Sequence, residues 1–337
     1  MRLFLWLMGL TAAVCAGGAL VWVVLAEGQK QGLERWLELR RSEGWLAEVT
    51  AVDISGFPTR FDRRLEAPSL ADPRAGWAWD APFLEMGSDA WDPTHVTFVF
   101  PTEHSLALPG ARIAITSEEM GAIAAVVPDL SLALREVGFT TEALRLEGRE
   151  GWRAAAEAVT ITVARRSEEA APPNTYDVTL DATGVLLPDR LVEDIAPAGA
   201  GGQAGLLTLA GLVTTDRPID RTVIERGEIG AEAILLRAGT LSYAGIDLRL
   251  KGRLTADANG FAAGTLDLVA EDWRRLLSSL VASGAVSGGM ESTVRRAMEL
   301  ISMFSGGDRL EVPISFGGGD IRVGPVVIGK APRLRRP

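Results

Sequence analysis

Residues 245–256 read GIDLRLKGRLTA, a segment in which apolar and charged side chains alternate. Successive side chains of a β-strand point to opposite faces, so one face of this segment is apolar and the other is charged. Such alternation is typical of an antiparallel sheet with one covered face and one face in water. The apolar face carries Ile246, Leu248, Leu250 and Leu254. We expect these four residues to line either a groove that binds an apolar ligand or a closed core.

The same two-residue period extends over most of the chain after residue 45. Residues 257–260, DANG, follow the first segment and predict a hairpin turn, because Asn-Gly accepts positive φ angles at low cost. The remaining predicted strands are 45–54, 94–100, 112–116, 129–137, 143–147, 158–165, 175–187, 206–215, 232–241, 264–269, 309–316 and 320–328. We therefore predict a mainly β (α+β) protein with a large antiparallel, curved sheet or a β-sandwich-like body.

Amphipathic helices are expected near both ends of this body. Apolar side chains recur every three or four residues in 29–44, 272–282 and 291–304. The first helix could lie on a bilayer or cover one end of the β body, and its weak net charge favours the covering role. The later two are joined by a Gly/Ser-rich segment, so they can pack together or against the sheet.

The N-terminal residues 1–28 are predicted to be a transmembrane anchor. Residues 3–26 carry no charge, and as a helix they would span roughly 36 Å, more than the ~30 Å of a hydrocarbon core. Trp6 and Trp22 lie near the two ends, where indole rings prefer the interface. Arg2 favours a cytoplasmic N-terminus, which places the rest of the chain in the periplasm. The alternative is a signal peptide cleaved after Ala26.

The Gly- and Ala-rich residues 197–205 form the best candidate linker within the β region. They separate a β-rich half, residues 45–196, from a second β-rich half, residues 206–332, which contains the two later helices. Residues 333–337 form a short basic tail. The sequence thus predicts an anchor, a helix, two β-rich halves and a tail.

Composition excludes several classes of function. A net charge of −10 and scattered arginines argue against a nucleic-acid partner. The only cysteine, Cys15, lies within the apolar segment, so neither disulfides nor cysteine–zinc sites are expected. Two histidines, His95 and His104, cannot make a three-histidine zinc site. No metal, cofactor or catalytic residue is therefore predicted.

Two sets of side chains could still carry chemistry. Adjacent carboxylates at 118–119, 168–169, 193–194 and 271–272 could serve a carboxylate-dependent hydrolase, although solvated surface explains most of them and Asp272 suits a helix N-cap. Trp77, Trp79 and Trp91 are candidates for an aromatic platform that stacks on sugars. Packing in the core or at its rim is the simpler explanation of these tryptophans.

Several short sequence motifs resemble those of one bacterial family. They are Gly56-Phe57-Pro58, Asp72-Pro73, GWAWDAP at 76–82, WDPTHV at 91–96, Gly324-Pro325 and Ala331-Pro332. Together with the apolar N-terminus, they resemble domain of unknown function 2125 of Gram-negative bacteria, over most of residues 1–110 and 240–332. This family brings no established activity. The layout is more distantly similar to AsmA-like envelope proteins, which implies lipid transport or membrane homeostasis, although this chain is much shorter.

Three functions follow as expectations. The first is a membrane-anchored periplasmic module that binds lipid or another amphipathic ligand in an apolar groove. The second is an adaptor that binds other envelope proteins, through a sheet edge or through Gly9, Ala13 and Gly17 on one face of the anchor. The third is the carboxylate-dependent hydrolase of envelope polymers.

Overall fold

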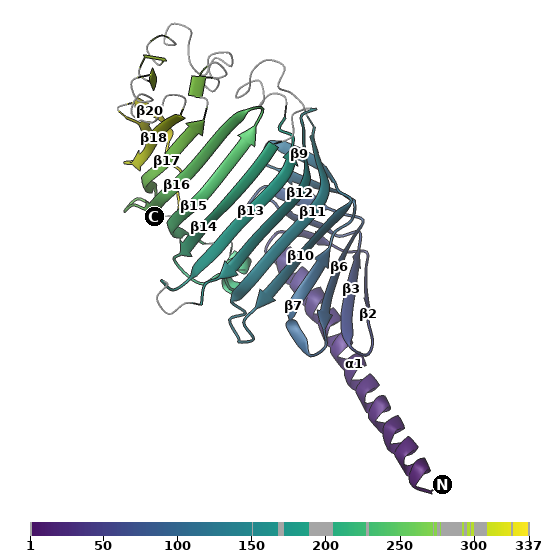
Figure 1. Cartoon of the computed structure of the whole chain (residues 1–337). Coiled ribbons are helices and arrows are strands. Elements are labelled where there is room, and N and C mark those ends of the chain that lie inside the picture. Colours follow the sequence, from purple (N-terminus) through teal and green to yellow (C-terminus); the bar gives the residue numbers. More distant parts are fainter. Residues whose placement is uncertain are drawn as a thin grey trace. The chain divides into compact units, whose positions relative to one another are not determined.

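The computed structural model describes residues 2–149, 151–167, 172–188, 205–226, 229–271, 309–324 and 326–335, with isolated helical residues at 273, 274, 277, 292, 295, 296, 298 and 299. Most of the described residues lie in strands that pair antiparallel, so the predicted mainly β class is confirmed. The chain divides into two compact units, Met1–Ala124 and Ala125–Pro337 (Figure 1).

The first unit combines one long helix with short strands. Its elements are α1 (Arg2–Ser42), β1 (Leu46–Glu48), β2 (Ala51–Ser55), β3 (Arg60–Glu66), β4 (Ser69–Asp72), β5 (Trp77–Asp80), β6 (Phe83–Asp89), β7 (Asp92–Val99), β8 (Glu103–Leu108) and β9 (Ala111–Thr116), while β10 (Glu119–Val126) spans the division. The C-terminal half of α1 packs on β1 and β2 and buries Leu37. The helix expected over residues 29–44 therefore covers strands, which is the role that its weak net charge predicted.

The second unit is built from longer strands. Its elements are β11 (Leu134–Gly148), β12 (Arg153–Arg165), β13 (Thr175–Val185), β14 (Gly205–Thr215), α3 (Arg221–Arg226), β15 (Ala231–Tyr243), β16 (Ile246–Ala256), β17 (Ala262–Glu271), β18 (Arg309–Gly317), β19 (Asp320–Val323) and β20 (Val326–Lys330). From β11 to β20 each strand pairs with its successor in the chain. The sheet is a meander, so its strand order follows the sequence.

The predicted DANG turn is confirmed between β16 and β17. Asp257 organises it, because its carboxylate accepts backbone N–H bonds from Asn259 at 2.8 Å and from Phe261 at 2.9 Å. Gly260 has a φ of +81°, which glycine adopts without strain. The hairpin therefore fixes how β16 and β17 pair.

The sequence missed β3 to β6, β8 and β10. In β3, Phe61 and Leu65 are buried, but Arg63 lies between them on the same face and breaks the apolar alternation. Arg63 is held there because its guanidinium donates to the Ser88 hydroxyl at 2.6 Å. A charged residue at an inward position therefore hid a genuine strand.

The division between units also differs from the expected linker. It lies at Ala124–Ala125, whereas residues 197–204 are outside the described part of the chain. The strands on either side of that segment, β13 and β14, pair directly with each other. Most of the two helices predicted over 272–282 and 291–304 also lies outside the described residues, although every described position within them is helical.

The helix α1 runs without a break from Arg2 to Ser42, across the predicted boundary at residue 28. In the part of the chain that the structure describes, no helix combines the length and the apolar character needed to cross a membrane. The anchor expected over residues 1–28 therefore stays a prediction.

The close approach of β16 and β17 at Gly252 gives a first prediction. Gly252 has a φ of +147°, and a Cβ there would lie 2.3 Å from the Thr265 carbonyl oxygen. We expect Gly252→Ala to lower the free energy of unfolding by about 2 kcal/mol or more, since both the backbone angle and the contact become strained. Urea denaturation of the full chain, followed by circular dichroism, measures this loss.

Gly317→Ala is the matched control, because a Cβ at Gly317 would meet nothing within 4 Å. It should change stability by no more than about 0.5 kcal/mol. Equal stability of the two variants would contradict the assigned pairing of β16 with β17.

Candidate functional site

Strand register in the second unit aligns apolar side chains into a continuous row. Directly opposed residues of an antiparallel pair share a face of the sheet. Following the register from β11 to β18 gives Phe139, Ile161, Leu180, Leu209, Gly239, Leu250, Leu268 and Val312. We call the face that carries this row the apolar face.

A parallel row on the apolar face is nearly as apolar. Its members are Thr141, Val159, Ala182, Leu207, Leu241, Leu248, Ala270 and Leu310. A third row begins with Val137, Val163 and Val178 and ends with Leu266 and Ile314. The apolar character is therefore a property of the whole face and not of one strand.

The opposite face carries the sequence neighbours of these residues and is polar apart from the buried Val269. The corresponding row is Thr140, Thr160, Asp181, Thr208, Thr240, Arg249, Val269 and Glu311. Ion pairs also occur on this face, where Arg237 contacts the Asp177 carboxylate at 2.6 Å. The sheet thus separates an apolar surface from a hydrated one.

The predicted groove residues on β16 lie in the part of the apolar face that the protein itself covers. Ile246 and Leu254 are buried. Leu248 packs on the cluster of Trp273 and Leu277, both of which are fully buried. Leu250 packs with Leu254 in a neighbouring cluster. The structure thus brings the four residues onto one face, as predicted, but they contribute to packing there.

The part of the apolar face formed by β11 to β14 is more accessible. Phe139, Ile161 and Leu180 are half-buried, and Leu209 is 37% exposed. Among the described residues, no buried core cluster includes any of these four side chains. They are the better candidates for contact with a ligand. The sequence predicted most of these strands but not the register that aligns them.

Two arginines lie at one end of this accessible surface. Glu136 pairs with Ala164, which places Arg135 opposite Arg165 on the apolar face, next to Val137 and Val163. Both arginines are exposed. Asp129 faces the same region, and its pKa is lowered chiefly because the Ser131 hydroxyl donates to it, with Arg165 adding a smaller attraction. The surface therefore joins an apolar area to a cationic end.

The three candidate tryptophans do not form one platform. Trp77 packs edge-on against Trp45, with ring centroids 5.2 Å apart. Trp79 packs against Phe100 and His104, with both pairs of centroids 6.2 Å apart. Trp91 lies in the turn between β6 and β7 and is 71% exposed. Trp77 and Trp79 thus serve packing, and Trp91 is left as a separate exposed ring.

The histidines and carboxylates form no metal centre within the described residues. The pKa of Asp92 is lowered chiefly because the Thr94 hydroxyl donates to its carboxylate, with a further contribution from its contact with His95. Burial beside Trp79 and Phe100 lowers the pKa of His104. A cavity of about 440 Å³ lies between α1 and β2, but Lys30, Glu34, Glu38 and Arg41 give it a charged lining.

Comparison with known proteins gives one match. The family model described as an uncharacterized protein conserved in bacteria (DUF2125) matches residues 22–332. No curated protein and no solved structure matches the chain, so the similarity to AsmA-like envelope proteins stays an expectation. The match covers nearly the whole chain, and the protein therefore belongs to the DUF2125 family of bacterial proteins.

Proposed function

We propose that this protein is anchored in the inner membrane by the start of α1 and holds a lipid against its apolar face in the periplasm. The observation that carries the proposal is the row Phe139, Ile161, Leu180 and Leu209, which is apolar yet only half-buried. The adjacent row on the opposite face is polar. A surface of this kind suits an elongated apolar ligand that lies across the strands.

The energetics favour exchange of the ligand over permanent capture. Removing an acyl chain from water gains about 0.8 kcal/mol for each buried methylene. A lipid that moves from a bilayer to the apolar face merely exchanges one apolar environment for another, so the hydrophobic gain nearly cancels. Such a face can accept a lipid from a membrane and release it again.

Arg135 and Arg165 favour an acidic headgroup. They lie on the apolar face at the strand ends of β11 and β12, beyond Val137 and Val163, so a headgroup that turns from the rows toward these strand ends would meet them. A guanidinium binds phosphate or carboxylate through paired, charge-assisted hydrogen bonds. The ligand class that we assign is an anionic amphiphile.

The contacts of Trp22 support an anchor that is retained. Its ring stacks on Phe61 with centroids 5.4 Å apart, and its indole N–H donates to the Arg60 carbonyl oxygen at 2.9 Å. A signal peptidase that cut after Ala26 would remove these contacts. Residues 3–21 would then remain for the membrane and span about 28 Å, close to the thickness of a hydrocarbon core.

Site-specific photocrosslinking tests lipid binding. A photoreactive p-benzoylphenylalanine replaces Leu209 in the full chain, in cells whose acyl chains carry radiolabel. The matched control is Thr208, the preceding residue on β14, whose side chain belongs to the polar face. We expect a radiolabelled adduct from position 209 and little from position 208. Equal labelling, or no labelling at either position, would overturn the lipid-binding proposal.

Extraction at alkaline pH tests the anchor. The full chain should stay in the membrane pellet after a carbonate wash. A double substitution, Leu10→Arg with Val14→Arg, should release it, because each arginine near the centre of a membrane helix costs about 2.5–3.5 kcal/mol. Gln31→Arg, a charged substitution on an exposed part of α1, should leave the distribution unchanged. Recovery of the unmodified chain in the soluble fraction would contradict the anchor.

A further inference from the structure

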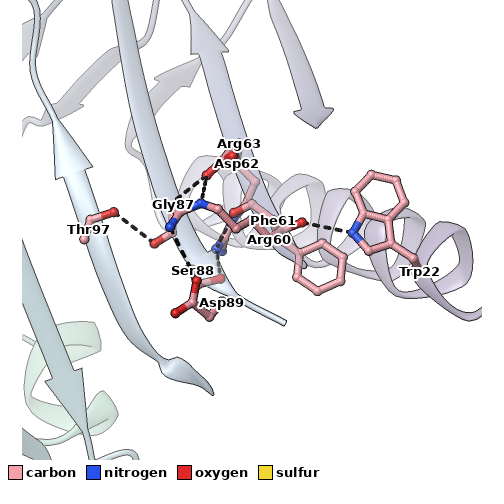
Figure 2. Close-up of polar contacts among 9 residues, drawn as sticks. All are labelled: Trp22, Arg60, Phe61, Asp62, Arg63, Gly87, Ser88, Asp89 and Thr97. Atoms are coloured by element: carbon pink, nitrogen blue, oxygen red, sulfur yellow. Dashed lines mark hydrogen bonds and ion pairs between the residues drawn. The ribbon is translucent and has the colours of Figure 1, made fainter. Parts of the chain in front are cut away.

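One end of the first unit is organised around Trp22. Its ring lies face to face with Phe61, and its N–H donates to the Arg60 carbonyl oxygen (Figure 2). The Trp22 ring is also edge-on to Phe57, with ring centroids 5.6 Å apart. These contacts fix where the apolar start of α1 meets the strands. Beyond this point, toward its N-terminus, α1 projects away from the strands (Figure 1).

Two turns lie side by side at this end. Residues 56–59 connect β2 to β3, residues 90–91 connect β6 to β7, and the Ala90 N–H donates to the Thr59 carbonyl oxygen at 2.9 Å. Each turn presents one large apolar ring to the surroundings. Phe57 is 54% exposed and Trp91 is 71% exposed.

Local backbone geometry keeps Phe57 at the tip. Gly56 has a φ of +96°, and a Cβ at this position would lie 2.9 Å from the Arg60 carbonyl oxygen. A residue with a side chain could therefore not replace Gly56 without moving the turn. The Gly56-Phe57-Pro58 motif thus holds an exposed aromatic ring beside the helix.

The helix adds apolar side chains at the same end. On the faces of α1 that turn away from Phe61, the exposed residues near Trp22 are Leu20, Val21, Val23, Val24 and Leu25. We define these five residues together with Phe57 and Trp91 as the apolar collar. Its members come from the helix and from both neighbouring turns.

Charged side chains around the collar are largely paired. Arg60 contacts the carboxylates of Asp62 at 3.2 Å and Asp89 at 3.4 Å. Asp92, next to Trp91, pairs with His95 and accepts a hydrogen bond from Thr94. Paired charges can lie in the headgroup region of a bilayer at little free-energy cost, whereas their desolvation in hydrocarbon would be costly.

We infer that the apolar collar inserts into the interface of the bilayer that the start of α1 enters. The inference rests on the membrane anchor proposed above and adds to it a specific contact between the folded unit and lipid. Leu25 lies three residues beyond Trp22, and the collar residues on α1 therefore extend about 4.5 Å along the helix beyond Trp22. This extent is close to the 5–10 Å depth to which apolar groups insert at a membrane interface.

The opposite end of the unit provides a control position. Arg60 pairs with Asp89 at the collar end of β3 and β6, and Glu66 pairs with Phe83 at their other end. The chain continues from there through β4 to the turn at 73–76, which leads into β5 and where a Cβ on Gly76 would contact Pro109. Leu108, next to Pro109, is likewise an exposed apolar residue at the end away from the collar.

Spin labelling tests the inference. The full chain, with Cys15→Ala and a single nitroxide at either Trp91→Cys or Leu108→Cys, is reconstituted in phosphatidylcholine vesicles. Power saturation then compares collisions with oxygen, which concentrates in lipid, and with a nickel chelate, which stays in water. We expect the ratio of oxygen to nickel collisions to be clearly higher at position 91 than at position 108.

The two proposals fail in distinguishable ways. If the labelled chain floats with the vesicles but position 91 is as accessible to nickel as position 108, the inserted collar is wrong and the anchor stands. If the chain does not float with the vesicles, the anchor itself is wrong and the inference fails with it. Lipid binding at Leu209 is measured independently of both outcomes.

Discussion

The register of the antiparallel pairs from β11 to β18 is the constraint on which the second unit depends. Because side chains alternate with a period of two, a slip of one residue at a single pair would exchange the faces of every strand beyond it. Such a slip between β13 and β14 would bring Thr208 into the row of Leu180. The separation of an apolar face from a polar face therefore depends on correct pairing at every strand.

The two ends of the apolar face illustrate how one surface can serve two purposes. Around β16 to β18, side chains such as Trp273 and Leu277 cover it and make a closed core. Along β11 to β14, its leucine, isoleucine and phenylalanine side chains retain partial access to solvent. Packing thus stabilises one part of the sheet and leaves the other available to a ligand. Within the first unit, Trp22 has a comparable double role, since it packs on Phe61 at the point where the apolar helix leaves the strands.

Local sequence patterns predicted the fold class well. Alternation in β16, the DANG turn and the three-to-four-residue period before Ser42 each depend on neighbouring residues, and each is present in the structure. Strands with inward polar residues were missed, as the buried contact of Arg63 with Ser88 in β3 shows. The boundary between units could not be predicted from the glycine-rich segment, because glycine-rich composition between two strands does not by itself mark the division between two folded units.

The candidate site was harder to predict than the fold. The residues 246, 248, 250 and 254 were chosen because their own strand alternates most clearly, and strong alternation also marks a well-covered core. Phe139, Ile161, Leu180 and Leu209 come from different strands, so only the register shows that they form one surface. Interactions between strands that are distant in sequence leave little signal in a single chain.

The central claim is that the accessible part of the apolar face binds an amphiphile, and native mass spectrometry of the full chain tests it most directly. The protein is extracted and exchanged into lipid-free detergent, and the unmodified chain is compared with Leu209→Asp and Thr208→Asp. The account predicts a retained lipid mass on the unmodified chain and on Thr208→Asp, and its loss from Leu209→Asp. A bare protein mass in all three, or equal lipid retention by both variants, would contradict it.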